Sequence, residues 1–348
     1  MSELHKFLFE GLPVRGMLVR LTDGWREVLS RRATAGAFAA PVRALMGEMA
    51  AAAVLMQSNI KFNGALVLQV SGDGPVKLAV AEAQSDLAFR ATATVVGEVP
   101  ADARLEAMLN VHGQGRCAIT LDPKDKLPGQ QPYQGVVPLH GDRREPLQEL
   151  SQVLEHYMLQ SEQLDTRLVL AANDEIAAGL LIQRLPVEGE GNLQGRAGAG
   201  PSQVGPTPSG GTPAQPAWGR LSLNEDEIGL SEGFNRIAHL ASTLTREELL
   251  TIDAETLLHR LFWQERLLRF VPNADAPQPH FACTCNRARV VRMLKGLGRE
   301  EVEGVVAEQG RVEIACEFCG VKYHFDPVDV GELFTPQRDQ PPGSSTVN

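Results

Sequence analysis

The stretch FACTCNRAR, residues 281–289, places Cys283 and Cys285 on either side of a single threonine, and it decides how the C-terminal part of the chain folds. Thirty residues after Cys285 comes a second close pair, Cys316 and Cys319, in the stretch CEFCG. The chain has 348 residues and only five cysteines, and four of the five fall within 37 residues. The question that the sequence raises therefore concerns four thiols together.

Two close pairs of cysteines are typical of a zinc site. Zinc prefers four thiolate or imidazole ligands at tetrahedral corners, and a folded segment between the pairs would bring the ligands together. The intervening sequence predicts two short helices over 289–298 and 299–310, the second with Gly310 as its C-cap, and then a strand over 311–315. Gly320 would let the backbone turn tightly behind the last sulfur. The metal ligands predicted for one Zn²⁺ are Cys283, Cys285, Cys316 and Cys319.

Other interpretations of the cysteines are four unrelated buried thiols or two permanent disulfides. The start of the chain, MSELHKFLFEGLP, lacks the pattern of a secretory signal, which predicts a cytoplasmic protein. Because the cytosol keeps thiols reduced, permanent disulfides are disfavoured there. With four cysteines present, His280 and His324 are not expected to be ligands, and Cys117 is expected to be a small buried apolar residue.

Four thiolates leave no open coordination position, so the predicted site is structural or a sensor and not catalytic. Oxidation of the sulfurs to disulfides would remove the ligands and expel the metal. Because zinc binding energy in a small domain is also folding energy, a segment of about 60 residues would be expected to unfold with that loss.

The amino-acid composition limits the classes of partner that the protein is expected to bind. Hydrophobic residues make up 43% and charged residues 22% of the chain, as in soluble globular proteins, and the formal net charge is -10. This acidic balance argues against a nucleic-acid or membrane partner. The most apolar window, Met49–Met56, is too short to span a bilayer and predicts a buried helix.

The chain divides at a segment rich in glycine and proline. Residues 187–217 hold eight Gly and five Pro, a composition typical of a flexible linker. We predict five parts, which are an N-terminal α+β domain (1–186), a linker (187–218), a helical region (219–275), a zinc-binding redox-switch domain (276–335) and a disordered tail (336–348).

The N-terminal part is predicted to be α+β, with a mixed sheet packed against helices. Strands are indicated at 17–21, 64–83 and 167–173, with a hairpin turn at 72–75, and helices at 41–57 and 147–162. The sequence GQGRCA at 113–118 resembles a dinucleotide fingerprint, but a strand-like run follows it where that motif needs a helix. No G-x-S-x-G, Walker loop or H-E-x-x-H is present, so we predict no catalytic residues and no enzyme activity.

The region after the linker is predicted to be helical. Thr245 and Glu248 fit a capping box, and Asp253 is a good N-cap for a helix over 254–270. One side of that helix is predicted to be apolar, and it consists of Leu257, Leu258, Leu261, Phe262, Leu267 and Leu268. The helix is expected either to pack permanently on the N-terminal domain or to be able to separate from it.

The sequence resembles the 33-kilodalton heat-shock chaperone family, a bacterial redox-regulated holdase. The resemblance covers nearly the whole chain and is carried by HKFLFEGLPVRG, SGDGPVKLAV, YQGVVPL, SEQLDTRL, TREELLTIDAETLLHRLF, FACTCNRAR and CEFCGVKYHFDPVDV. It implies that the four cysteines bind zinc in the reduced, inactive protein and form the disulfides Cys283–Cys285 and Cys316–Cys319 on oxidation. It also implies that residues 1–186 are a domain for client binding and dimerisation and that residues 219–275 are a metastable helical region, which then unfolds. Dimers would hold unfolding client proteins without ATP.

Two other classes of function stay open from the residues alone. A zinc-ribbon module that binds nucleic acid is disfavoured because residues 276–335 hold seven Lys or Arg against nine Asp or Glu. A dithiol oxidoreductase would use Cys316 and Cys319, but it needs the C-x-x-C beside a βαβ pattern, and no partner helix is expected to follow.

Overall fold

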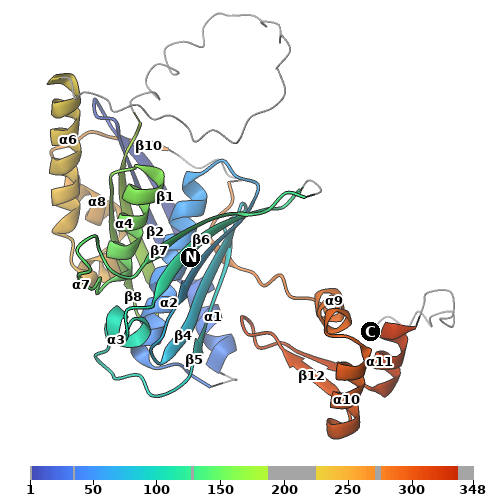
Figure 1. Cartoon of the computed structure of the whole chain (residues 1–348). Helices are drawn as coiled ribbons and strands as arrows, with labels where there is room; N and C mark the ends of the chain where they lie inside the picture. Colours follow the sequence, from blue (N-terminus) through green and yellow to red (C-terminus); the bar gives the residue numbers. More distant parts are fainter. Residues whose placement is uncertain (1, 34–35, 127–128, 187–224, 271–275, 336–348) are drawn as a thin grey trace, which may run out of the picture.

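Two β-sheets and the helices between and around them form the main body of the protein (Figure 1). A small group of elements from residues 283–334, here called the cysteine unit, lies beside that body. This mixed architecture confirms the predicted α+β class. The structure is a computed structural model and describes residues 2–33, 36–126, 129–186, 225–270 and 276–335.

The first sheet is antiparallel and has the strand order β10-β1-β2-β9-β8. Successive side chains point to opposite faces of the sheet, and both faces carry apolar residues. Helix α2 covers one face, and helices from the region after residue 225 cover the other. The strands are β1 (Glu3–Phe9), β2 (Val14–Leu21), β8 (Thr166–Ala172), β9 (Ala177–Arg184) and β10 (Leu267–Phe270).

The second sheet has the order β11-β5-β4-β3-β6-β7, antiparallel except at β11. The predicted hairpin is confirmed, since β3 and β4 pair across the turn at residues 72–75. The GQGRCA stretch leads into β6 and not into a helix, which confirms that it is not a dinucleotide fingerprint. The strands are β3 (Gly64–Ser71), β4 (Val76–Gln84), β5 (Ala88–Val95), β6 (Arg116–Pro123), β7 (Tyr133–Pro138) and β11 (His280–Phe281).

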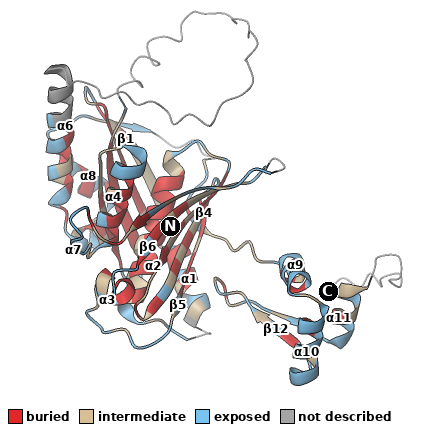
Figure 2. Ribbon diagram, viewed as in Figure 1, coloured by how far each residue is buried: buried red, intermediate tan, exposed pale blue. Residues whose placement is uncertain are grey.

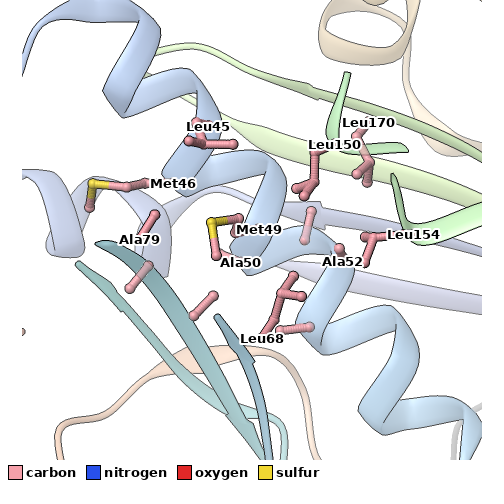
Figure 3. Packing of buried hydrophobic residues seen from close by; sticks show 14 of the residues in the cluster. Leu45, Met46, Met49, Ala50, Ala52, Leu68, Ala79, Leu150, Leu154 and Leu170 are labelled. Atoms are coloured by element: carbon pink, nitrogen blue, oxygen red, sulfur yellow. The ribbon is translucent and has the colours of Figure 1, made fainter. Parts of the chain in front are cut away.

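Helix α2 (Ala40–Asn59) lies between the two sheets and contacts both (Figure 3). Residues 50–53 are four consecutive alanines with 0% exposure, and their small size lets both sheets approach the helix axis closely. The window Met49–Met56 is therefore a buried helix, as predicted. None of the helices among the described residues is long and apolar enough to cross a membrane. The other helices of the body are α1 (Asp23–Ala33), α3 (Leu105–Leu109) and α4 (Leu150–Glu162).

Three helices, here called the middle helices, pack on the outer face of the first sheet and form a second core with it. Their predicted start signals are confirmed, because Thr245 and Glu248 form a capping box and Asp253 accepts a hydrogen bond from the backbone N–H of Thr256. In this core the Phe262 ring makes an edge-to-face contact with Phe9, with centroids 5.0 Å apart. The middle helices are α6 (Glu225–Ser242), α7 (Arg246–Thr251) and α8 (Ala254–Phe262).

The predicted helix over 254–270 is wrong in its second half. Helix α8 ends at Phe262, and Leu267–Phe270 form β10, which pairs antiparallel with β1. The free edge of β1 offers backbone partners that outweigh the helical pattern of the sequence, since strand or helix choice for a short apolar run depends on its neighbours. Leu268 is 50% exposed and does not belong to the apolar face that was predicted for it.

The cysteine unit has a small core of its own. Its helices are α9 (Arg287–Leu297), α10 (Arg299–Gln309) and α11 (Pro327–Phe334), and its strands β12 (Val312–Ala315) and β13 (Lys322–Phe325) form a hairpin. The two helices and the strand predicted between the cysteine pairs are confirmed, and Gly310 adopts the left-handed φ of 77° expected of a C-cap. Figure 2 shows buried residues throughout the body but few in this unit. The predicted linker at 187–218 and tail at 336–348 lie outside the described residues.

Candidate metal centre

The structure brings the four predicted cysteines together. The Sγ atoms of Cys283, Cys285, Cys316 and Cys319 all lie within 4.8 Å of one another. Cys283 Sγ is 3.7 Å from Cys316 Sγ, and Cys285 Sγ is 3.3 Å from Cys319 Sγ. Each of these two short contacts joins the first pair to the second, and all four cysteines are free thiols.

Two local structures position the thiols. Cys283 and Cys285 lie in the extended segment that follows β11, and Asn286 ends it by accepting a hydrogen bond from the backbone N–H of Arg289 at the start of α9. Cys316 and Cys319 lie in the turn between β12 and β13, where the backbone N–H of Gly320 donates to the Cys316 carbonyl at 2.7 Å. Gly320 has a φ of 69°, a conformation that favours glycine, as the sequence predicted.

The sulfur positions fit a tetrahedral metal ion. Metal–sulfur bonds of about 2.3 Å require sulfur–sulfur edges of about 3.8 Å. The contacts of 3.7 Å and 3.3 Å are close to that edge length, so only small shifts separate the thiols from a complete coordination shell. Soft thiolates select zinc, Cu(I) or iron–sulfur clusters over hard cations. Four sulfurs also complete a tetrahedral shell and leave no position for a substrate.

The environment separates the acidities of the thiols. Burial opposes ionisation of Cys283, but hydrogen bonds from the Cys285 backbone and side chain and from Arg90 lower the pKa of Cys283 to about 7. Burial raises the pKa of Cys316 and that of Cys319. The Tyr323 hydroxyl donates to Cys285 Sγ at 3.2 Å, which raises the pKa of Tyr323 to about 12.

Strand β5 of the body contacts the cysteine unit beside the thiols. The Arg90 guanidinium donates to Cys283 Sγ at 3.7 Å and lies 4.1 Å from the centre of the Phe318 ring. Glu82 on β4 holds Arg90 in an ion pair, and only 12% of each of the two side chains is exposed. Two residues further along β5, the Thr92 hydroxyl donates to the Glu317 carbonyl at 2.9 Å. The metal centre is therefore attached to the second sheet through a charged and aromatic contact.

The histidines near the cysteines belong to other contacts. His280 makes a hydrogen bond with the Gln278 carbonyl, and His324 Nδ1 lies 3.3 Å from the Glu313 carboxylate. Among the described residues, the four cysteines are the only group of three or more potential ligands close enough to hold a metal ion. Cys117 is fully buried in β6, and burial raises its pKa to about 12, as expected of an inert apolar residue.

The surroundings of the C-x-x-C differ from those of a dithiol oxidoreductase. Cys316 and Cys319 lie between two antiparallel strands and not at the start of a helix, where such enzymes hold their reactive thiol. A helix does follow β13, since α11 starts at Pro327, so the predicted absence of a following helix is wrong. That helix is separated from the C-x-x-C by β13 and does not restore a βαβ pattern.

The sequence did not identify the contacts from the body. Arg90 and Glu82 are single charged residues in otherwise regular strands, and neither forms a motif with the cysteines. Arg90 is 193 positions from Cys283, so the contact depends entirely on the tertiary fold. The one signal available in the sequence was for the pairing of β4 with β5, because opposite charges at paired positions stabilise a sheet. The register does pair Glu82 with Arg90.

Comparison with known proteins gives consistent results. Residues 2–326 match the family model described as Hsp33 protein. The 33 kDa chaperonin of Chromobacterium violaceum is 41% identical over 333 residues, which cover 96% of this chain and 94% of the relative. The 33 kDa chaperonin of Methylobacillus flagellatus is 38% identical and covers 98% of this chain and 97% of the relative. The crystal structure of the 33 kDa chaperonin from Thermotoga maritima has a TM-score of 0.66 at 19% identity, covers 95% of this chain and 97% of that chain, and shows the same fold.

Proposed function

The chain belongs to the Hsp33 family, and on this premise we propose that it is a redox-regulated, ATP-independent holdase chaperone and not an enzyme. In this proposal the reduced protein binds one Zn²⁺ and is inactive. Oxidation releases the metal and makes the protein able to hold unfolding client proteins in the cytoplasm. The observation that carries the proposal is the set of four sulfurs within 4.8 Å of one another, two from each end of a folded segment.

We assign the zinc to the four cysteines named above. When bound, zinc would keep all four sulfurs as thiolates, which are the reactive form toward an oxidant. We propose that oxidation then forms Cys283–Cys285 and Cys316–Cys319. Formation of each disulfide removes two electrons from two thiolates. Two hydrogen peroxide molecules accept the four electrons, together with four protons from the solvent, and become four water molecules. The sulfurs are then no longer ligands, and the folding energy that the metal supplied, roughly 10–16 kcal/mol in small domains, is lost.

The client surface is assigned to the middle helices and the sheet face beneath them. This interface buries Phe7, Phe9 and Leu18 of the first sheet against Leu257, Leu258 and Phe262 of α8. Its separation would expose a large apolar surface on both sides, which unfolded chains bind through the hydrophobic effect. We propose that two oxidised chains present these surfaces as a homodimer.

We keep the bounds of the five parts predicted from the sequence, and we add that the third and fourth parts each supply a strand to the sheets of the first part. The parts are 1–186, 187–218, 219–275, 276–335 and 336–348. Strand β10 of the third part and strand β11 of the fourth pair with the sheets of the first part. The third and fourth parts are therefore attached to the body by backbone hydrogen bonds as well as by side-chain contacts.

The test follows metal, thiols and activity in one sample. Zinc content and free thiols are measured before and after brief peroxide treatment at raised temperature, while aggregation of an unfolding test protein is followed by light scattering. We expect one zinc to be lost as four thiols disappear and suppression of aggregation to develop. Retention of zinc with unchanged aggregation would leave a structural zinc module and reject the proposal.

A single-ligand variant tests the residue assignment. Cys283→Ser removes one of the four proposed ligands and leaves Cys285 without its proposed disulfide partner, so we expect weaker zinc binding and a protein that is either active without oxidant or not activated by it. Cys117→Ser is the matched control, because Cys117 lies in β6 outside the cluster. Unchanged zinc content and normal activation in Cys283→Ser would contradict the assignment.

A further inference from the structure

A groove between β5 and α1, here called the edge groove, holds residues 279–282 of the chain itself. His280 and Phe281 pair parallel with Ala88 and Phe89 at the open edge of the second sheet. The backbone N–H of His280 donates to the Leu87 carbonyl at 3.3 Å, and that of Ala282 donates to the Phe89 carbonyl at 3.2 Å. This short segment therefore covers a sheet edge that would otherwise present unpaired backbone groups.

The groove is shaped for a strand that carries an aromatic side chain. Phe281 packs against the main core, and the Arg31 guanidinium on α1 lies 5.2 Å from the centre of its ring. Gly24 of α1 allows the close approach, because a Cβ at this position would lie 2.9 Å from the backbone nitrogen of Phe281. Pro279 is buried at the entrance. A helix and an edge strand that enclose an extended peptide are a recurrent arrangement for binding peptides by strand addition.

The segment in the groove is directly continuous with the metal centre. Cys283 follows Ala282, and the contacts of Arg90 and Thr92 with the cysteine unit lie on β5 immediately after the pairing with β11. Only two residues of β11 pair with β5, so the segment stays in the groove through its attachment at both ends as well as its own hydrogen bonds. Unfolding of the cysteine unit removes the attachment at one end.

We propose that the edge groove is a second client-binding site, which takes one extended segment of an unfolding protein parallel to β5. In this proposal, which rests on the proposed function, the client places an aromatic or large aliphatic residue where Phe281 lies. Residues 279–282 occupy the groove while the cysteine unit is folded and leave it after oxidation. Pairing through the backbone suits a chaperone, because every unfolded chain offers the same N–H and C=O groups.

A labelled peptide tests the site directly. The probe is a fluorescein-labelled peptide of residues 277–284 with Cys283→Ser, and its binding to the full chain is followed by fluorescence anisotropy. We expect the oxidised chain to bind it and the reduced, zinc-loaded chain to bind at least about tenfold more weakly, because the tethered segment competes at high effective concentration. A peptide N-methylated at the position of Ala282 cannot donate to the Phe89 carbonyl and should bind the oxidised chain about tenfold more weakly.

A variant of the chain tests whether residues 279–282 close the edge groove in the reduced protein. Phe281→Ala should loosen the segment and let the reduced chain bind the probe, whereas Met293→Ala, at a 45% exposed residue on α9, should not. Equal binding of the probe and its N-methylated form would show general stickiness and overturn the proposal. Equal binding to reduced and oxidised chains would show that residues 279–282 do not close the groove, and would also overturn it.

Aggregation measured on the same oxidised samples separates this inference from the proposed function. Suppression of aggregation without probe binding would reject the edge groove and leave the holdase function intact. Absence of both zinc release and suppression would reject the function, and the client site with it. Loss of probe binding in parallel with dimer formation, as chain concentration rises, would assign the groove to a second copy and overturn the client proposal. Displacement of the probe by an unfolding test protein would support the client proposal.

Discussion

At the scale of single residues, Arg90 is the charged side chain that joins the body to the candidate metal centre. Arg90→Gln removes its contacts with Cys283 and Phe318 and leaves the mostly buried Glu82 carboxylate without its ion-pair partner, so that the Gln84 amide is the hydrogen-bond donor that remains to it. We expect a loss of stability of about 1–3 kcal/mol from that uncompensated charge and faster hydrogen exchange in residues 280–283. Urea unfolding and exchange monitored by mass spectrometry measure the two effects.

The double variant Arg90→Gln with Glu82→Gln is the matched control. It removes the uncompensated charge of Glu82 but does not restore the contact with the cysteine unit, so it should recover stability while exchange in 280–283 stays fast. Slow exchange in both variants would mean that Arg90 stabilises β4 and β5 but does not hold the cysteine unit.

Glu48 gives a pH dependence of known sign. Burial raises the pKa of its carboxyl above the usual 4.5, although Arg246 at the start of α7 opposes this. Glu48 therefore stabilises the folded chain fully below pH 4.5, and this contribution is lost as the pH rises through the folded-state pKa. Glu48→Gln cannot ionise. Relative to the urea midpoint of the parent chain, the midpoint of this variant should therefore be higher at neutral pH than at pH 4.5.

The exposed pair of Glu27 and Arg31 on α1 supplies the comparison for this experiment. Glu27→Gln should shift the midpoint little at either pH, because an exposed pair at i,i+4 spacing contributes only a few tenths of a kcal/mol. A midpoint difference for Glu48→Gln that is the same at both pH values would contradict the burial argument.

At this scale the sequence identified the residues whose chemistry is local. The cysteines, the capping residues Thr245 and Asp253 and the glycine at 320 each act through their own type and spacing, and all are found where they were expected. The Arg90 contact was not predictable, because it depends on how two distant segments meet. The opposite charges of Glu82 and Arg90 indicate at most a pair on neighbouring strands, and nothing in the sequence indicates that Arg90 contacts Cys283.

At the scale of elements, Arg20 on β2 holds helix α7 by its C-terminal end. Its guanidinium donates to the carbonyls of Leu249 at 2.8 Å, Leu250 at 3.3 Å and Ile252 at 2.5 Å. These carbonyls have no partner within the helix, so the positive charge satisfies them and complements the helix dipole. Arg20→Met should destabilise docking of the middle helices by about 2 kcal/mol and cause the reduced, zinc-loaded chain to suppress aggregation without oxidant.

The control for this prediction is Arg266→Met. Arg266 pairs with Glu10 at the surface, and 85% of its side chain is exposed, so its removal should leave the reduced chain inactive. Zinc content should stay at one per chain in both variants, since neither residue contacts the cysteines. An inactive Arg20→Met chain would mean that the apolar contacts alone keep the middle helices docked.

The elements also show where periodicity fails as a guide. The predicted helices at 41–57 and 147–162 are present as α2 and α4, because long apolar patterns at helical spacing have few alternatives. The run at 267–270 is short, and its backbone pairs with β1. A run of four residues obtains its structure from the edge beside it, which the local pattern does not contain.

At the scale of the whole molecule, the metal centre and the client surface proposed under the middle helices lie on different sheets. The described contacts of the cysteine unit run to β5 in the second sheet, whereas the middle helices pack on the first sheet with a core of their own. We therefore expect loss of the proposed zinc to unfold the cysteine unit first, without directly removing the contacts that dock the middle helices. We infer that release of those helices needs a second destabilising factor, and heat is the simplest one.

This separation predicts a two-step response to metal removal. A chelator under reducing conditions should abolish exchange protection in residues 287–334 at low temperature, because the small core of the cysteine unit depends on the metal. Protection in α7 and α8 should persist until the temperature is raised, and the suppression of aggregation that depends on release of the middle helices should begin only then. Arg20→Met should remove the need for heat. Simultaneous loss of protection in both regions at low temperature would instead show that the cysteine unit and the middle helices unfold as one cooperative structure.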